Sequence, residues 1–494
     1  MENEKIVLQK QNLKNYINIS ISELLYLCFF GMMFFAKGIG LYDGQGPYKI
    51  FLVLAFLCIV VKMCITEHSS IEWVIILLLL ALATVIYRVS GDKGVLIYMV
   101  MVVAMKNVSV KRVFQVGIVV WSVSMGGRFL LSLLSLEHVR TAVQTKSIFG
   151  DVLRYFMGFP HPNVLHISYL VLTALIIYCI WENYNWRHML WLMLGNLFLF
   201  FYSYSFTGGL GVILYILLSY YVKKIRIGKF QYFLVSLFFP FYIVFSIVFP
   251  VVLQGKYFEF ADRFFNNRIN FARHFLTLEN MSFFGNKAAD ITTAVITMDN
   301  SLVMALVIYG VPIFLLICAG YTGTISAYIK KQKNMELAMI CCFFIAGITE
   351  PFLFNTSFKN LTLLFVGEQF FLFLANKFPK QKQWAILSRY NISIQIPVQC
   401  LRQMAMWIRN IWDTHGKFIL RVGTAVALLL SIGAGLFYEP NSTALAVQKG
   451  NVLVYERIRV ILTAFFAGVT ASIIIIGIGY GLADYKKNKI YPGV

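Results

Sequence analysis

Residues 255–300 read GKYFEFADRFFNNRINFARHFLTLENMSFFGNKAADITTAVITMDN, and they form the longest polar stretch of a chain that is otherwise rich in apolar runs. The stretch lies between two of these runs, 230–253 and 301–319. Crossing the hydrocarbon core of a bilayer takes about 20 apolar residues, so both runs are candidates to cross it. The sequence therefore predicts a large loop outside the membrane between two membrane-spanning helices.

Composition places the whole chain in the membrane. Of its 494 residues, 59% are hydrophobic and 13% are charged, whereas soluble proteins carry about 25% charged residues. The formal net charge of +21 does not indicate nucleic acid binding, because the basic residues lie mostly in short connections between apolar runs. The eight cysteines lack the spacing of a zinc site or a disulfide framework, so we interpret them as packing residues.

Fourteen apolar runs are predicted to cross the membrane: 20–37, 48–66, 71–88, 94–106, 112–134, 163–182, 188–206, 208–222, 230–253, 299–328, 335–354, 358–376, 418–438 and 459–481. The predicted fold is all-α, a polytopic integral membrane protein of about 14 transmembrane helices. Lysine and arginine are more frequent in the connections that would share one side with the N-terminus. That bias predicts both termini in the cytoplasm and two long extracytoplasmic loops, 135–162 and 254–298.

Three regions follow from this pattern. Residues 1–376 form the predicted transmembrane core, and residues 418–494 form an appended C-terminal helix pair. Between them, residues 377–417 are basic and amphipathic, with an apolar face of Met404, Trp407, Ile408, Ile411 and Trp412. Basic residues combined with tryptophan predict a helix that lies on the cytoplasmic membrane surface.

The polar stretch itself is predicted to hold a helix over 257–278. On such a helix four polar residues fall within an arc of about 60°: Arg263, Asn267, Asn270 and His274. Arg268 lies instead in the middle of the apolar side. An unpaired buried guanidinium is too costly to keep, so Arg268 either reaches water, forms a structural salt bridge or binds an anionic group.

Three further charged residues are predicted at one depth, beneath the two long loops. Arg128 lies near the outer end of the fifth run, Asp299 opens the tenth, and Glu350 lies near the outer end of the eleventh. Polar residues within membrane spans are functional hypotheses by default. A structural ion pair is the alternative for each one, and their shared depth favours a site.

The other long loop contains basic residues and histidines: His138, Arg140, Arg154 and His161. His161 stands between two prolines, and Pro162 is suited to opening the next span. A histidine near its usual pKa of about 6.5 suits a general acid or base, while a plain capping residue is the alternative. The chain has no nucleotide-binding or hydrolase motif of soluble enzymes, and we expect neither a cofactor nor a metal.

Six short motifs follow one another over residues 150–375: Gly158-Phe159-Pro160-His161-Pro162-Asn163, Arg268, Phe284-Gly285, Asp299-Asn300-Ser301, Tyr309-Gly310, and Thr349-Glu350 with Asn355 and Asn360. Their order resembles that of Wzy-type polysaccharide polymerases, which are related to O-antigen ligases. The sequence departs from that pattern at Pro160, where a glycine is usual, and at Phe206-Thr207-Gly208, where many relatives carry an arginine.

The resemblance implies a GT-C-like, O-antigen-ligase-like membrane glycosyltransferase of capsule or exopolysaccharide synthesis. Such enzymes polymerise undecaprenyl-diphosphate-linked oligosaccharide units on the outer face of the bacterial plasma membrane. The lipid-linked oligosaccharide and membrane lipids are then the expected partners, with flippase and chain-length regulator proteins as further candidates. A lipid-linked oligosaccharide flippase and an O-antigen-ligase-like transferase are the alternative functions.

The leaving group of such a reaction is a lipid diphosphate, whose negative charge calls for arginine. Arg268 is the first candidate to bind it. Supporting candidates for the diphosphate are Arg140, Arg154, Arg263, Arg273, His274 and Arg128. The base that activates the acceptor hydroxyl is left open among four residues: His161, His274, Glu350 and Asp299.

Overall fold

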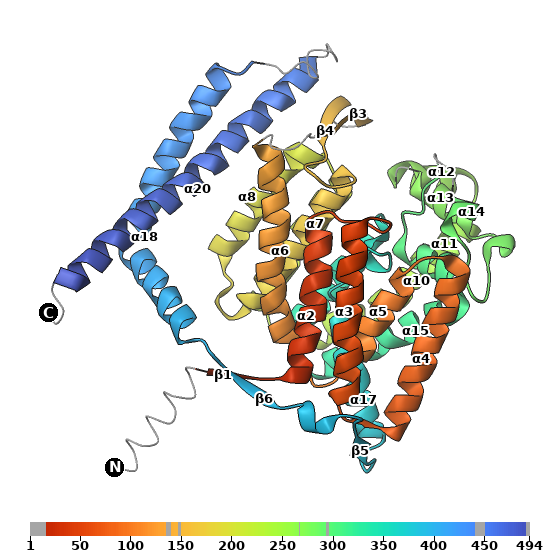
Figure 1. Cartoon of the computed structure of the whole chain (residues 1–494). Coiled ribbons are helices and arrows are strands. Elements are labelled where there is room, and N and C mark those ends of the chain that lie inside the picture. The colour runs from red at the N-terminus through yellow and green to blue at the C-terminus, as the bar shows by residue number, and fades with distance from the viewer. Residues whose placement is uncertain are drawn as a thin grey trace, which may run out of the picture.

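The computed structural model describes residues 16–134, 140–146, 150–265, 267–292, 296–439 and 450–490 (Figure 1). It is 76% helical, and ten helices in these ranges are long and apolar enough to cross a membrane. Two shorter helices, Gly94–Val103 and Asn334–Gly347, are also apolar. The chain is therefore a helical, polytopic membrane protein.

The helices of the core are α2 (Ile21–Gly38), α3 (Gly46–Ile65), α4 (Ser70–Ser90), α5 (Gly94–Val103), α6 (Val110–Leu133), α7 (Pro162–Cys179), α8 (Trp186–Ser203), α9 (Phe206–Lys224), α10 (Lys229–Ile243), η2 (Val244–Val248), α11 (Phe249–Val252), α15 (Ser301–Lys330), α16 (Asn334–Gly347) and α17 (Leu363–Lys377). Two long helices follow them, α18 (Gln399–Leu436) and α20 (Gly450–Ile490). Every predicted span overlaps one of these helices, with α10, η2 and α11 covering a single span. How many of them cross the membrane stays a prediction.

Three antiparallel strand pairs join segments at the two ends of the bundle. Strand β1 (Tyr16–Ser20) pairs with β6 (Ser393–Pro397), β2 (His68–Ser69) with β5 (Gln383–Trp384), and β3 (Thr141–Lys146) with β4 (Gly150–Tyr155). The first two pairs hold the segment after α17 against the N-terminal end of α2 and the start of α4 (Figure 1). The β3–β4 hairpin lies at the opposite end, which we call the loop end.

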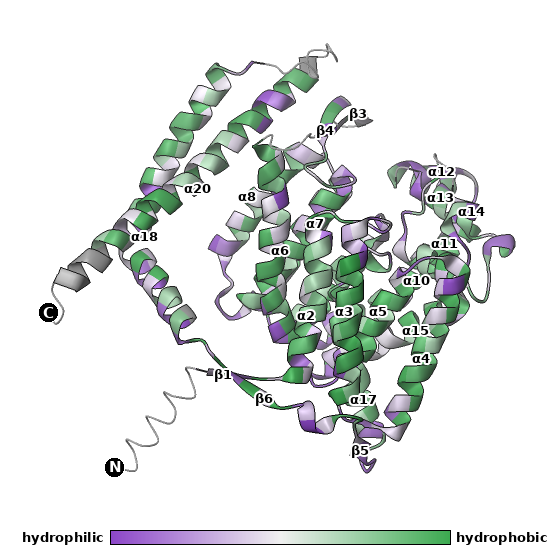
Figure 2. Cartoon of the chain, viewed as in Figure 1, coloured by the Kyte–Doolittle hydropathy of each residue, from purple (hydrophilic) through white to green (hydrophobic). Residues whose placement is uncertain are grey.

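Apolar side chains line the bundle both inside and outside. Trp121 of α6 is fully buried, stacks on Phe34 of α2 at 4.2 Å between ring centroids, and donates from Nε1 to Ser168 O at 2.9 Å. Large apolar residues such as Leu78 and Phe233 are exposed on outward helix faces. In Figure 2 hydrophobic residues predominate along the helices of the core, while hydrophilic residues are concentrated in the connections and at helix ends. This is the pattern of helices surrounded by lipid.

The polar stretch at the loop end does not form the single predicted helix. It forms α12 (Gly255–Phe264) and α13 (Arg268–Phe275), then a 3₁₀ turn η3 (Leu278–Asn280) and the short helix α14 (Ala288–Ile291). The prediction over 257–278 is wrong at Asn267, which adopts the left-handed region with φ 66°. Asp262 stabilises this break, because its carbonyl accepts from Asn267 N at 2.8 Å and its Oδ1 from Asn270 N at 2.8 Å. The predicted polar stripe is interrupted there.

The amphipathic stretch around Met404 and Trp412, predicted as a helix on the membrane surface, is helical in the structure, while its position on the membrane surface stays a prediction. Residues 399–436 form one continuous helix, α18, so the expected boundary at 417/418 falls inside it. The segment between α17 and α18 holds β5, the 3₁₀ turn η5 (Ser388–Tyr390) and β6. Helix α18 packs along α20, and the two form a pair at the side of the bundle (Figure 1).

Candidate functional site

Three charged residues from distant parts of the sequence meet at the loop end. Arg268 begins α13, Asp299 lies just before α15, and Glu350 follows α16. Arg268 Nε lies 3.4 Å from Asp299 Oδ2, and Arg268 Nη2 lies 3.8 Å from Glu350 Oε1. The sequence predicted that Asp299 and Glu350 share one depth, and the structure adds Arg268 between them.

Local hydrogen bonds hold the backbone segments that carry the two carboxylates. Asn300 caps α15, with Oδ1 accepting from Leu302 N at 2.9 Å and from Val303 N at 3.1 Å. The next residue, Ser301, donates from Oγ to Glu350 O at 2.7 Å. This bond ties the start of α15 to the end of α16, so Asp299 and Glu350 are held on neighbouring backbones.

Glu350 is buried, with 9% of its surface exposed. Its Oε1 accepts from Asn163 Nδ2 at 2.7 Å and from Thr207 Oγ1 at 3.3 Å. Burial raises the pKa of Glu350 to about 7, the positive charge of Arg268 acts against that rise, and Asp299 adds to it. A carboxyl group that titrates near neutrality can take a proton and release it again under physiological conditions.

Arg154 is connected to the Glu350 carboxylate through Asn163. It lies on β4, is 4% exposed, and burial lowers the pKa of Arg154 to about 10. Three of its nitrogens donate hydrogen bonds: Nε to Ser203 O at 2.6 Å, Nη1 to Gln144 Oε1 at 2.7 Å and Nη2 to Asn163 Oδ1 at 2.5 Å. Asn163 then donates to Glu350, so Arg154 acts on Glu350 through Asn163.

Arg268 has a different environment, because its buried Nε makes no hydrogen bond to any of the residues that the structure describes. Asp299 lies within ion-pair distance of Nε but outside hydrogen-bonding geometry. Burial also raises the pKa of Asp299, and the charge of Arg268 opposes that rise. A guanidinium with an unused donor beside two carboxylates can bind oxygen atoms of a phosphate group.

Two other predicted residues shape the turn before α7. Arg128 Nε donates to Gly158 O at 3.2 Å, which holds the motif that contains His161. His161 is exposed and caps α7, with Nδ1 accepting from Asn163 N at 3.1 Å. His161 therefore helps to place Asn163, the residue that reaches Glu350.

The remaining predicted residues lie elsewhere. Arg273 donates to the carbonyls of Pro250 and Leu253 and lies 3.8 Å from the Phe258 ring centroid, so it closes the end of α11. Three others are exposed, and no hydrogen bond or ion pair among the described residues joins them to Glu350: Arg140, Arg263 and His274. His138 lies outside the described residues.

Three residues near Glu350 were not predicted as site residues from the sequence: Asn163, Thr207 and Lys359. Lys359 is 3% exposed and donates to Val164 O at 3.3 Å. Its Nζ also lies 5.9 Å from the Trp121 ring centroid. The sequence feature that could have identified Lys359 is its position at the edge of a predicted apolar span, where the charge of a lysine needs a polar or anionic partner.

Two glycines of the motifs lie against each other, where the loop before α15 contacts the middle of that helix. Gly285 has φ +85° and Gly310 has φ +78°. A Cβ atom at Gly285 would lie 2.0 Å from Ile308 O, and one at Gly310 would lie 2.2 Å from Phe283 O. The Phe284-Gly285 and Tyr309-Gly310 segments therefore cross at a distance that only glycine permits.

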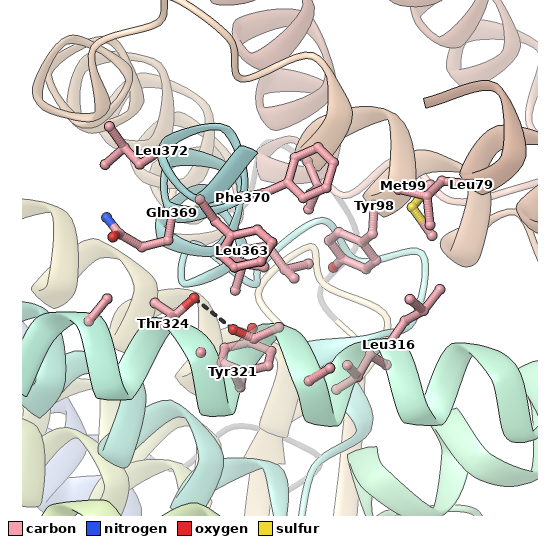
Figure 3. A pocket seen from close by; sticks show the side chains of 18 of the residues that line it. Leu79, Tyr98, Met99, Leu316, Tyr321, Thr324, Leu363, Gln369, Phe370 and Leu372 are labelled. Carbon is pink, nitrogen blue, oxygen red and sulfur yellow. Dashed lines mark hydrogen bonds between the residues drawn. The ribbon is translucent and has the colours of Figure 1, made fainter. Parts of the chain in front are cut away.

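A separate cavity of about 940 Å³ lies between α4, α5, α15 and α17 (Figure 3). Its walls are mostly apolar, including Leu79, Met99 and Leu316. The hydroxyl of Thr324 is used within its own helix, donating to Gly320 O at 2.7 Å. Arg268, Asp299 and Glu350 are not among its lining residues, so the cavity is distinct from the charged site.

Comparison with family models, with curated proteins and with solved structures found no match to this chain. The chemistry of the site is therefore inferred from its own geometry. Among the described residues, no group of three or more histidine, cysteine, aspartate or glutamate side chains is arranged to hold a metal ion. Two complementary groups therefore lie together at this site. The cation Arg268 can stabilise an anion, and the neighbouring carboxyl group of Glu350, with a pKa of about 7, can accept a proton.

Proposed function

We propose that this protein is a Wzy-like membrane glycosyltransferase that polymerises undecaprenyl-diphosphate-linked oligosaccharide units during surface polysaccharide synthesis. The observation that carries the proposal is the position of Arg268, 3.4 Å from Asp299 and 3.8 Å from Glu350. A polar reaction on a lipid-bound substrate needs charged groups at one end of a membrane bundle. The order of sequence motifs supports the same assignment.

The donor in this proposal is a growing glycan on a lipid diphosphate. During transfer the bond between the anomeric carbon and the diphosphate oxygen breaks, and the electron pair leaves with the diphosphate. Arg268 is suited to stabilise that developing charge, because its guanidinium stays protonated and binds phosphate oxygens through paired donors. The nearby carboxylates hold the guanidinium in place until the substrate enters.

The acceptor in this proposal is the hydroxyl at the non-reducing end of the next unit. Its oxygen forms the new bond to the anomeric carbon, and its proton must go to a base. Glu350 is the best-placed base, since its pKa is about 7 and no hydrogen bond among the described residues engages its Oε2. Asp299 is the second carboxylate at the site, and His161 acts through Asn163.

The membrane arrangement of the proposal comes from the sequence. Fourteen crossings with both termini in the cytoplasm would place the loop end outside the bacterial plasma membrane. Lipid-linked units would then reach Arg268 from the outer leaflet. A flippase would deliver these units before the reaction, and a chain-length regulator would act together with the polymerase.

A lipid-linked oligosaccharide flippase is the second candidate, because many helices also suit a transporter. A transporter is expected to hold charges near the membrane midplane. Glu368 of α17 is the residue that best fits that reading, but its Oε2 accepts from Tyr328 Oη at 3.0 Å and from Gln369 Nε2 at 3.1 Å. An O-antigen-ligase-like transferase, which would use the same charged groups, is the third candidate.

Deletion of the gene in its host, followed by mass spectrometry of lipid-linked glycans, tests the proposal. A polymerase predicts single repeat units on undecaprenyl diphosphate, exposed outside and without long polymer. Units trapped on the cytoplasmic side would identify a flippase instead. Long chains that remain on the lipid carrier would identify a ligase-like transferase.

A further inference from the structure

The C-terminal helix α20 contacts the β3–β4 hairpin through a buried polar cluster. Tyr155 Oη donates to Glu456 Oε2 at 2.5 Å. Arg459 Nη2 donates to Glu456 Oε2 at 2.7 Å and to Tyr155 Oη at 3.2 Å. We call these three residues, Tyr155, Glu456 and Arg459, the brace.

The brace is closely packed as well as hydrogen-bonded. Glu456 is 2% exposed, and the Arg459 guanidinium lies 4.3 Å from the Tyr155 ring centroid and 5.1 Å from that of Tyr202. Tyr202 Oη also hydrogen-bonds Thr463 Oγ1 at 2.7 Å, one turn further along α20. A buried ion pair costs desolvation that apolar residues would avoid, so its presence favours a specific positional role.

Strand geometry connects the brace to the charged site. Successive side chains of a β-strand point to opposite faces, so Tyr155 and Arg154 of β4 face opposite ways. Tyr155 reaches α20, while Arg154 reaches Ser203, Gln144 and Asn163. A shift of β4 against α20 would therefore move Arg154 relative to Asn163, the residue that donates to Glu350.

We propose that the C-terminal helix pair positions β4, and that Glu456 and Arg459 are positioning residues for Glu350 through Tyr155, Arg154 and Asn163. This inference rests on the proposed function for its activity readout, while its structural readout stands alone. It gives the appended pair a role in the reaction, although no residue of the brace contacts Glu350 directly.

The test uses three full-length variants. Tyr155→Phe removes only the hydroxyl that joins the brace, and Arg459→Met removes its cation. Arg457→Met is the matched control, because Arg457 lies on the same helix but donates from Nε to Gly435 O of α18 at 2.8 Å. Hydrogen exchange of β3 and β4 in detergent-solubilised protein is followed by mass spectrometry, and polymer formation is measured against pH.

Both brace variants are expected to speed exchange in the hairpin, while Arg457→Met leaves it at the wild-type rate. Weakening the hydrogen bond from Asn163 to the Glu350 carboxylate raises the pKa of Glu350. Loss of one ordinary hydrogen bond corresponds to a shift of about 0.7 pH unit, so the acid limb of the pH–rate profile should move to higher pH by that amount. A merely less stable protein would lose activity at all pH values without moving that limb.

Unchanged hairpin exchange in Tyr155→Phe would overturn the inference, and so would faster exchange with an unmoved acid limb. Should Arg459→Met fail to fold, Tyr155→Phe still decides, because it leaves the ion pair intact. A wild-type protein without polymerising activity would contradict the proposed function instead, and the exchange experiment would still show whether the helix pair holds the hairpin.

Discussion

Buried charges at the loop end differ in how completely their neighbours satisfy them. Arg154 uses three nitrogens for hydrogen bonds. Arg268 Nε, by contrast, has no hydrogen-bond partner within the described part of the chain, although two carboxylates lie within 4 Å of the guanidinium. Full satisfaction suits a supporting residue, and an unused buried donor suits a group that waits for a ligand. This contrast is the reason to assign substrate binding to Arg268 and support to Arg154.

Replacing Arg268 is therefore expected to abolish the proposed reaction. Arg268→Ala should lower polymer formation about 100-fold or more, the usual cost of removing one group that stabilises transition-state charge. Arg268→Lys should be nearly as damaging if two donors are needed. Polymer length is measured on gels, and membrane insertion is checked by the amount of folded protein. Arg187→Ala, an exposed arginine at the start of α8, is the control, and full activity in Arg268→Ala would contradict the assignment.

Glu350 leads to a pH prediction for activity. As a base it must be deprotonated, so the rate should rise as pH increases through about 7, the pKa of Glu350. Glu350→Gln should lose roughly 100-fold or more in rate, within the range for general bases, and should lose this limb of the profile. A wild-type profile without an acid limb near neutrality would exclude Glu350 as the base.

The same carboxyl group predicts a pH dependence of stability. Its pKa is raised on folding, from 4.5 to about 7, so its contribution is fully present below 4.5 and lost as pH rises through 7. Glu350→Gln lacks this loss. The Tm of Glu350→Gln minus the Tm of wild type, measured in detergent, should therefore be larger at pH 8.5 than at pH 5. The same Tm difference at both pH values would contradict a buried environment for Glu350.

The sequence predicted part of this site and not the rest. Asp299 and Glu350 could be grouped by depth, since the ends of apolar runs mark the membrane surface. The contacts from Asn163 and Thr207 to Glu350 join residues 187 and 143 positions apart. Such contacts depend on which helices pack together, and hydrophobic periodicity carries no information about that choice.

At the scale of secondary structure elements, the polar stretch is built from short helices with sharp breaks. Asn267 has positive φ and stands directly before α13 as its N-cap, and Asp262 accepts two backbone hydrogen bonds around it. Spans were predictable because each is a long apolar run. The break was not, because asparagine is compatible both with a helix interior and with the left-handed region.

The crossing of Gly285 and Gly310 gives a prediction at this scale. Gly285→Ala and Gly310→Ala should each destabilise the fold by about 1–3 kcal/mol or more, because the added methyl groups meet backbone atoms that cannot move aside. Thermal unfolding in detergent measures the effect. Gly44→Ala is the control, since Gly44 also has positive φ but has open space around it. Equal stability of all three variants would contradict the crossing.

For the whole molecule, the described ends of the bundle differ in character. The loop end carries the β3–β4 hairpin and α12 to α14, and the other end carries β1, β2, β5 and β6 (Figure 1). The strand pairs were not predicted, because β3 and β4 lie in a polar loop without a clear alternation of apolar and polar residues, and β6 pairs with a strand almost 400 residues away, as in Tyr16 with Pro397. Only the folded bundle brings such segments together.

Membrane orientation is a prediction at this scale. Thr145→Cys in the hairpin should react with a membrane-impermeant maleimide in intact cells, because the loop end is expected outside. Lys382→Cys should react only after the membrane is permeabilised. Both are made in a chain whose eight native cysteines are replaced. The opposite pattern would reverse the predicted topology and remove the charged site from the outer face.

Purified protein in liposomes would show whether this chain joins lipid-linked sugars at the Arg268 site. The liposomes contain one defined undecaprenyl-diphosphate-linked repeat unit from the host and no other enzyme, and the products are analysed by mass spectrometry. We predict a ladder of longer lipid-linked glycans with free undecaprenyl diphosphate for the wild type, and single units only for Arg268→Ala. Single units with the correctly folded wild-type protein would contradict the account.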